Sequence, residues 1–400
     1  MKPRIFFLSF YPPTPTMGGA MAYHRHFLER NDVELFVATD DRRVLDYHLS
    51  CPVLVFEQPK WLGRLCKTRF FRWAHSFRHL FAGYFVPEVV LKAAEEFRPD
   101  IIFTIAGSWG WTAQMSKVLA DRLGVPLVGS FNDWFDFGVI IHPWLRPLLE
   151  EKYRSFYREC DLALSTSEGM KEELGSHHNS HILYPIGGER GDDQSEFYPS
   201  RGERPFRVFF GGNLGEWYGR MIEDLVKVTM HSEAPVDFRI YGGNQNWSDE
   251  FDKMVRESGF YQGLLPFHQL ASAAAEADCL LLPMGFGEES ALIERTSFKT
   301  KFLDYLFYRK PILVWGPEYC SAVRVAREFD SAEICTNPDP VAVLTALLEL
   351  SLNPERQTRL VENADKMYRS RFSPEDIHQA LIDKLLRLHP QCEVKEHAIC

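Results

Sequence analysis

The 400-residue sequence lacks the features that mark membrane-spanning, disulfide-rich and general nucleic-acid-binding proteins. It has no run approaching the roughly 20 apolar residues that a membrane-spanning helix needs. Its eight cysteines include no CxxC pair and no zinc-ligand spacing, which predicts free thiols in the reducing cytoplasm. The formal net charge of -10 excludes an overall basic field for neutralising nucleic-acid phosphates.

Several catalytic signatures are also missing. There is no GxSxG motif and no Ser/His/Asp or Cys/His nucleophile pattern, which argues against a hydrolase. Asp133 and Asp136 form only a DxxD pair, and the close histidine pairs have no companion cysteine or carboxylate at ligand spacing. The sequence therefore predicts no metal site.

What the sequence does contain is a recurring pattern of short apolar runs separated by helical stretches. Continuous apolar runs are typical of buried strands in a parallel sheet, which need helical crossovers. The pattern predicts an α/β protein with two Rossmann-like, doubly wound domains, residues 1–190 and 205–372, joined by a Gly- and Pro-rich linker around residues 187–205. A helix over residues 373–390 is a candidate for packing back on the first domain. The predicted strands lie in IFFLSF, VELFVAT, VLVFE, DIIFTIAG, PLVGSF and LALSTS, then in FRVFFGGN, VDFRIYGG, GLLPF, DCLLLPMGF, KPILVWG and AEICTN.

Two glycine turns follow predicted strands, where doubly wound sheets bind their ligands. Gly18 and Gly19 follow the first strand, and Gly211-Gly212-Asn213 follow the first strand of the second domain. Glycine lets a phosphate approach backbone amides, and Arg220 adds a positive charge near the start of the next helix. The alternative is a flexible loop or a turn that only allows tight packing, and the motif alone does not decide.

The stretch ERTSFKTKFLDYL carries a lysine and an aspartate three residues apart. If a helix starts near Thr300, Lys301 and Asp304 lie on one face, where they suit a phosphate charge and a ribose diol. The alternative is an ordinary surface ion pair, which contributes only about 0.3 to 0.5 kcal/mol.

The order and spacing of these segments resemble those of GT-B glycosyltransferases, particularly the GT4-like group of retaining enzymes. In the second half the resemblance is carried by GLLPFHQLASAAAEADCLLLPM and TSFKTKFLDYLFYRKPILVWGP. In the first half it is carried by RPDIIFTIAG, VPLVGSFNDW and CDLALSTSEGMKEEL, and ILYPIGGERGDDQSEFYP resembles the family's first-domain closing stretch. It extends over roughly residues 1–385 and implies two domains that face a cleft.

The resemblance implies a nucleotide-sugar donor held mainly by the second domain and a glycan or lipid-linked acceptor held mainly by the first, with no required cofactor or metal. Asp304 matches the acidic residue that contacts ribose hydroxyls, and Lys301 matches a lysine near the diphosphate. Gly18 and Gly19 match the first-domain glycine loop, which approaches the donor phosphate or sugar. Asn132 and Asp133 are candidates for facing the acceptor.

Some family positions hold other residues. The first glutamate of the common EX7E motif is replaced by Thr296, with Glu294 as a nearby substitute for sugar contact, and a family histidine is replaced by Asn132. Arg220 is a displaced candidate for the lysine that follows the second glycine turn. We expect a retaining, hexosyltransferase-like enzyme of polysaccharide biosynthesis in which Arg220, Lys301 and the glycine turns stabilise the departing diphosphate. The alternatives are a non-catalytic nucleotide- or lipid-binding partner subunit, which the missing residues favour, and a sugar-nucleotide epimerase.

Residues 60–81, KWLGRLCKTRFFRWAHSFRHLF, contain six Lys or Arg, six Phe or Trp and no acidic residue. This mixture predicts contact with anionic lipid headgroups and a cytoplasmic protein at the inner face of the membrane. The alternative is a solvated basic face whose aromatic residues pack inward.

Overall fold

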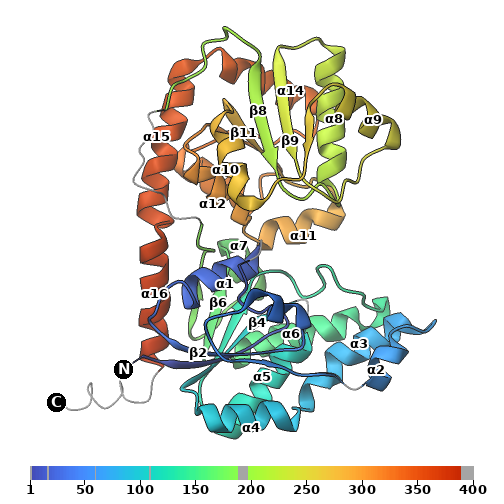
Figure 1. Cartoon of the computed structure of the whole chain (residues 1–400), viewed down its shortest axis with the longest axis vertical. Helices are drawn as coiled ribbons and strands as arrows, with labels where there is room; N and C mark the ends of the chain where they lie inside the picture. Colours follow the sequence, from blue (N-terminus) through green and yellow to red (C-terminus); the bar gives the residue numbers. More distant parts are fainter. Residues whose placement is uncertain (1, 16–17, 59, 108–109, 188–196, 389–400) are drawn as a thin grey trace, which may run out of the picture. The chain divides into compact units, whose positions relative to one another are not determined.

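The computed structural model describes residues 2–15, 18–58, 60–107, 110–187 and 197–388 (Figure 1). The chain divides into two compact units. Unit 1 comprises Met1–Ile186, Thr296–Phe298 and Glu375–Cys400, and unit 2 comprises Gly187–Arg295 and Lys299–Pro374. Most of the predicted linker, residues 188–196, lies outside the described residues. The domain boundaries predicted from the sequence stay predictions.

Unit 1 is built on a parallel sheet in the order β3-β2-β1-β4-β5-β6-β7. Its strands are β1 (Arg4–Leu8), β2 (Glu34–Thr39), β3 (Val53–Val55), β4 (Ile101–Ala106), β5 (Leu127–Phe131), β6 (Leu162–Ser165) and β7 (Ser180–Ile182). Its helices are α1 (Gly19–Phe27), η1 (Arg42–Tyr47), α2 (Lys60–Leu65), α3 (Phe71–Phe81), η2 (Ala82–Tyr84), α4 (Glu88–Phe97), α5 (Gly110–Leu123), η3 (Pro143–Leu145), α6 (Arg146–Glu159), α7 (Glu168–Leu174) and α16 (Pro374–Arg387).

Helices cover both faces of this sheet because its strands are apolar on both sides. On one face, the ring of Phe7 lies 6.0 Å from that of Phe27 on α1, and Leu381 of α16 belongs to the same core. On the other face, the ring of Phe6 lies 6.3 Å from that of Phe97 on α4. The carboxyl-terminal helix is thus part of the core of unit 1.

Unit 2 has a second parallel sheet in the order β10-β9-β8-β11-β12-β13. Its strands are β8 (Phe206–Gly211), β9 (Val236–Tyr241), β10 (Tyr261–Gly263), β11 (Cys279–Pro283), β12 (Ile312–Trp315) and β13 (Glu333–Cys335). Its helices are α8 (Tyr218–His231), α9 (Asp249–Glu257), α10 (Phe267–Ala275), α11 (Glu288–Thr296), α12 (Thr300–Phe307), α13 (Ser321–Phe329), α14 (Pro340–Ser351) and α15 (Pro354–Arg371).

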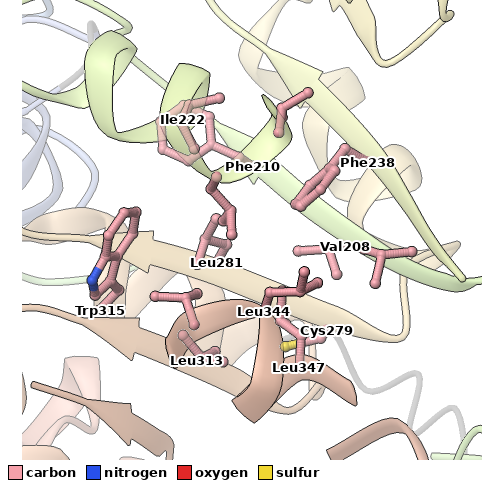
Figure 2. Close-up of a cluster of buried hydrophobic side chains, with 14 of the residues drawn as sticks. Val208, Phe210, Ile222, Phe238, Cys279, Leu281, Leu313, Trp315, Leu344 and Leu347 are labelled. Carbon is pink, nitrogen blue, oxygen red and sulfur yellow. The ribbon is translucent and has the colours of Figure 1, made fainter. Parts of the chain in front are cut away.

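The core of unit 2 shows the same two-sided packing. Val208 and Phe210 face Ile222 of α8 and Leu344 of α14 (Figure 2). The intervening Phe209 points to the opposite face, where its ring lies 6.1 Å from that of Tyr305 on α12. The predicted doubly wound α/β architecture is therefore confirmed in both units.

Two details of the strand prediction are wrong. The run GLLPF is not a strand: β10 ends at Gly263, whose φ of +86° turns the chain, and Pro266 precedes α10. The short strand β7 has no long apolar run, and it forms because Ser180–Ile182 pair with Ala163–Ser165 of β6. Sheet pairing thus sets the position of β7, whereas the turn at Gly263 ends β10.

Candidate functional site

A cavity of about 420 Å³ lies in unit 1 at the carboxyl ends of β1, β2, β4 and β5. The strand order reverses between β1 and β4, which is where ligands bind in doubly wound sheets. The lining includes three residues predicted from the sequence, Gly19, Asn132 and Asp133. Residues that the sequence analysis missed also contribute: Ser9, Phe10, Tyr11, Asp41, Arg43 and Tyr47.

The side-chain amide of Asn132 is held in one orientation. Its Oδ1 accepts hydrogen bonds from the Tyr23 hydroxyl at 2.9 Å and from the Ser130 hydroxyl at 3.3 Å. Its Nδ2 lies on the side of Gly19, where an added Cβ would come within 3.3 Å. Burial raises the pKa of Tyr23 to about 12, so its phenol keeps its proton at neutral pH. Asn132 therefore offers N–H donors beside the start of α1.

Asp133 is anchored by its neighbours in unit 1. Its Oδ1 accepts a hydrogen bond from the Ser297 hydroxyl at 2.6 Å, and its backbone oxygen accepts one from the Tyr153 hydroxyl at 3.2 Å. The following aromatic residues, Trp134 and Phe135, are buried in the core. The carboxylate is thus a fixed acceptor on the cavity wall.

A second carboxylate in the wall is paired with an arginine. The Arg43 guanidinium donates from Nε to Asp41 Oδ1 at 2.9 Å and from Nη2 to Asp41 Oδ2 at 2.7 Å. Burial raises the pKa of Asp41, but the hydrogen bonds and charge of Arg43 outweigh it and the net pKa is lowered. This two-point pairing compensates the arginine charge, so the wall carries no strong attraction for an anion.

In unit 2, Lys301 forms the centre of a different site. The predicted start of its helix is confirmed, since α12 begins at Thr300, and Lys301 and Asp304 lie three residues apart on it. Lys301 Nζ lies 4.2 Å from the ring centre of Phe210 and 5.4 Å from that of Tyr218. Burial, followed by the charge of Lys299, lowers the pKa of Lys301 to about 7. No carboxylate in the described part of the chain forms an ion pair with it.

Glu294 lies beside this lysine but has another partner. Its side chain is fully buried, with Oε1 accepting a hydrogen bond from the Gly285 amide at 3.0 Å and Oε2 lying 3.3 Å from Lys299 Nζ. Lys299 also lies near Tyr218, at 6.0 Å from its ring centre. The sequence analysis missed Lys299 and Tyr218, although the KTK spacing places both lysines at the start of one helix.

The second glycine turn serves packing in this structure. The Gly211 amide donates to the Tyr305 hydroxyl at 3.2 Å, and the Gly212 amide donates to the Tyr241 carbonyl at 2.9 Å. Gly212 has a φ of +150°, and an added Cβ there would collide with Nζ and Cε of Lys301. The glycine thus makes room for the lysine, while both amides are already used.

The remaining predicted residues are Arg220 and Asn213 in unit 2 and Gly18 in unit 1. Arg220 is exposed in the first turn of α8, which has no side-chain cap at Trp217, and Asn213 lies exposed in the preceding loop. Gly18 precedes α1 with a φ of +78°, outside the lining of the unit 1 cavity. The structure therefore brings Lys301, Glu294, Asp304 and the glycine turn together in unit 2, and Gly19, Asn132 and Asp133 together in unit 1.

No group of three or more His, Cys, Asp or Glu side chains with the arrangement of a metal site occurs among the described residues. Among those residues there is also no helix that is both long and apolar enough to cross a membrane.

Comparison with known proteins finds a family match in unit 1 and a shared fold for the whole chain. Residues 21–184 match the family model for Glycosyltransferase Family 4. HepE of Anabaena, crystallised with UDP, is 15% identical with a TM-score of 0.61, over 97% of this chain and 100% of that chain. Residues 21–184 thus resemble Glycosyltransferase Family 4, and the chain as a whole has the GT-B fold.

Other solved structures have the same fold. A glycosyltransferase from Rickettsia africae is 11% identical with a TM-score of 0.64, over 97% of this chain and 98% of that chain. The α,α-trehalose 6-phosphate synthase of Burkholderia multivorans is 12% identical with a TM-score of 0.61, over 99% of each chain. A comparison with curated proteins gives no significant match. At these identities the likeness to the solved structures concerns the fold alone, and the family match covers only residues of unit 1.

Proposed function

We propose that this protein transfers a sugar, with retention and without a metal, from a nucleotide-sugar donor to a glycan or lipid-linked acceptor. The observation that carries the proposal is Lys301, a partly buried ammonium group packed against Phe210 and Tyr218 with no carboxylate paired to it among the described residues. A cation in such a place is stabilised when an anion binds. The diphosphate of a nucleotide sugar supplies that anion.

Each candidate residue has a role in this proposal. Lys301 and Arg220 stabilise the departing diphosphate, helped by the uncapped start of α8 and Asn213. Asp304 accepts hydrogen bonds from the ribose hydroxyls. Glu294 contacts the donor sugar and is held in place by its ion pair with Lys299. In a retaining transfer, a donor phosphate oxygen assists the acceptor on the same face, so no strong protein nucleophile is needed.

The cavity of unit 1 is the place where the acceptor binds in this proposal. Asn132 supplies hydrogen-bond donors and Asp133 an acceptor, which suits the hydroxyl groups of a sugar. We also propose that residues 60–81, on α2 and α3, contact the inner face of the membrane from the cytoplasm. Their aromatic residues do not all pack inward, because Trp61 is 63% exposed and Phe81 is 50% exposed.

One observation favours a second candidate function, that of a nucleotide-binding partner subunit without catalysis. The amides of Gly211 and Gly212 are engaged within unit 2, so fewer groups remain to stabilise a transition state. Such a subunit would bind the nucleotide-sugar donor without releasing a nucleoside diphosphate.

Mass spectrometry of the purified full chain with a panel of nucleotide sugars and a lipid extract tests these functions. UDP-sugars are tested first because HepE was crystallised with UDP. We expect one donor to release its nucleoside diphosphate, and Lys301→Ala and Asp304→Ala to lose this release. Lys253→Ala, which removes an exposed lysine from α9, is the matched control. The anomeric configuration of the product, read by NMR, tests retention.

Saturable donor binding with no released diphosphate would replace the transferase by the binding subunit. An altered free sugar nucleotide formed without any acceptor would indicate an epimerase instead.

A further inference from the structure

Large hydrophobic side chains are exposed mainly in two segments of unit 1. Of the 20 exposed large hydrophobic residues in the described chain, nine lie in residues 61–89 and three in residues 140–148. Twelve of the 20 thus gather in two short stretches, and the second stretch lies outside the region singled out from the sequence. Concentrated exposed apolar surface of this kind marks an interaction site.

The two segments meet through an aromatic row. On α3, the rings of Trp73 and Phe77 stack at 6.1 Å and those of Phe77 and Phe81 at 5.8 Å. Trp144 is 81% exposed, and its ring packs edge-on at 6.2 Å from the ring of Trp73. We call these four residues the aromatic surface. Figure 1 shows α3 beside α6, whose start follows Trp144.

The position of Trp144 is fixed by hydrogen bonding and stacking of its neighbour. The amide of His142 donates to the Ser76 hydroxyl on α3 at 2.8 Å, and the His142 ring lies 3.9 Å from that of Trp73. The opposite side of α3 is buried through Ala74 and Leu80. One side of α3 is thus anchored in the fold while the aromatic row faces solvent.

Exposed cationic side chains lie on α2 and in the turn that leads into α3. Lys60, Arg64 and Lys67 are exposed, and the guanidinium of Arg69 lies 4.9 Å from the ring centre of Phe70. No acidic residue occurs in residues 60–81. Aromatic rings edged by lysine and arginine, in a segment without acidic residues, suit the headgroup region of an anionic bilayer.

We propose that the aromatic surface, with Trp144 as a second anchor beside α3, docks on an anionic lipid bilayer and thereby selects acceptors anchored in that bilayer. The unit 1 cavity ends in Phe137 and Gly138, and Trp144 follows six residues later. A chain of that length spans at most about 20 Å, so the cavity wall lies within the reach of a lipid-linked sugar. This inference rests on the proposed function for the choice of acceptor but not for the docking itself.

Flotation of the full-length protein with vesicles tests the docking. We expect binding to phosphatidylcholine vesicles that contain roughly 30 mol% phosphatidylglycerol, and weak binding to phosphatidylcholine alone, since an anionic surface attracts lysine and arginine side chains near it. Trp144→Ser and Phe81→Ser should together lower the partition coefficient by about tenfold or more. Leu352→Ser, at a residue 75% exposed on unit 2, is the matched control and should bind like the unaltered protein.

A parallel titration with nucleoside diphosphate separates this inference from the proposed function. Loss of vesicle binding by Trp144→Ser with unchanged nucleotide affinity supports docking. Absence of vesicle binding by the unaltered protein overturns it, even if sugar transfer to a lipid-free acceptor is found. Concentration-dependent dimers that Trp144→Ser dissolves would also overturn it, because a second copy would then cover the surface.

Discussion

In the proposed function, Lys301 is the residue whose charge depends most directly on the bound nucleotide. With a pKa lowered to about 7 by burial, it is partly neutral in the ligand-free protein at pH 7.5. A bound diphosphate favours the charged form, so binding takes up a proton. We therefore expect nucleoside diphosphate affinity to fall as pH rises from 7 to 9, measured by titration calorimetry. Lys301→Ala should weaken binding by roughly 10- to 100-fold, the effect of losing one charge-assisted hydrogen bond.

The matched variant for this prediction is Lys301→Arg, because a guanidinium stays charged throughout this pH range. The ligand's own titration is common to both proteins and cancels in the ratio of their affinities. That ratio should change with pH above 7. A constant ratio would show that Lys301 does not carry the proton that is taken up.

Gly212 gives a second test at the scale of one residue. Gly212→Ala places a methyl group against the Lys301 ammonium and strains a backbone with φ of +150°. Gly259→Ala has comparable backbone strain, with φ of +74°, but its Cβ would meet no atom within 4 Å. Both should lose about 1–2 kcal/mol of stability from strain. Only Gly212→Ala should also weaken nucleotide binding, and equal affinities in the two variants would show that the close approach to Lys301 is unimportant.

At the scale of elements, a chain of hydrogen bonds joins α1 to α16 within unit 1. His378 Nε2 is hydrogen-bonded to the Asp32 carboxylate at 2.8 Å, and its Nδ1 is hydrogen-bonded to Nδ1 of His26 at 3.2 Å. The other ring nitrogen of His26, Nε2, is buried with no hydrogen-bond partner among the described residues. Burial first, then the charges of His378 and Arg30, hold the pKa of His26 well below its usual value.

A histidine whose pKa is lowered by folding destabilises the folded protein when it is protonated. The free energy of unfolding should therefore fall as pH drops below about 6.5, by up to about 1.4 kcal/mol per pH unit for this one group. His26→Leu should reduce that slope, whatever its effect on stability at neutral pH. Denaturant unfolding of both proteins between pH 5 and 8 measures the difference, and identical slopes would contradict the assignment to His26.

The elements also show how far sequence reasoning reaches. Runs such as DIIFTIAG and KPILVWG predict strands correctly, because β4 and β12 are buried on both faces. The helix that begins at Thr300 also starts where its sequence pattern predicts. The GLLPF run fails because an apolar run does not reveal that Gly263 turns the chain. Tyr11, Asp41 and Tyr47 were missed because residues of separate loops come together only when β1 and β2 pair. Three of the four residues of the aromatic surface lie in the stretch predicted from the sequence, and Trp144 was missed because it lies 71 residues along the chain from its contact, Trp73.

At the scale of the whole molecule, the candidate residues divide between two compact units. Lys301, Glu294 and Asp304 depend on the packing of unit 2, whereas Asn132 and Asp133 depend on that of unit 1, which includes Ser297. Substitutions far apart with no shared partners act additively on binding. Nucleotide affinity and acceptor use should consequently respond to different variants.

Asn132→Ala tests this division because it removes the donors of one cavity wall and leaves unit 2 intact. We expect unchanged nucleoside diphosphate affinity but at least a tenfold loss of sugar transfer, since one positioned hydrogen bond lost from the cavity costs roughly 1–3 kcal/mol. Lys301→Ala should both weaken nucleoside diphosphate binding and lose sugar transfer. Calorimetry with nucleotide and transfer measured with the identified donor give the two readouts. If Asn132→Ala weakened nucleotide binding as strongly as Lys301→Ala does, the donor would depend on the unit 1 cavity, and the assignment of that cavity to the acceptor would be wrong.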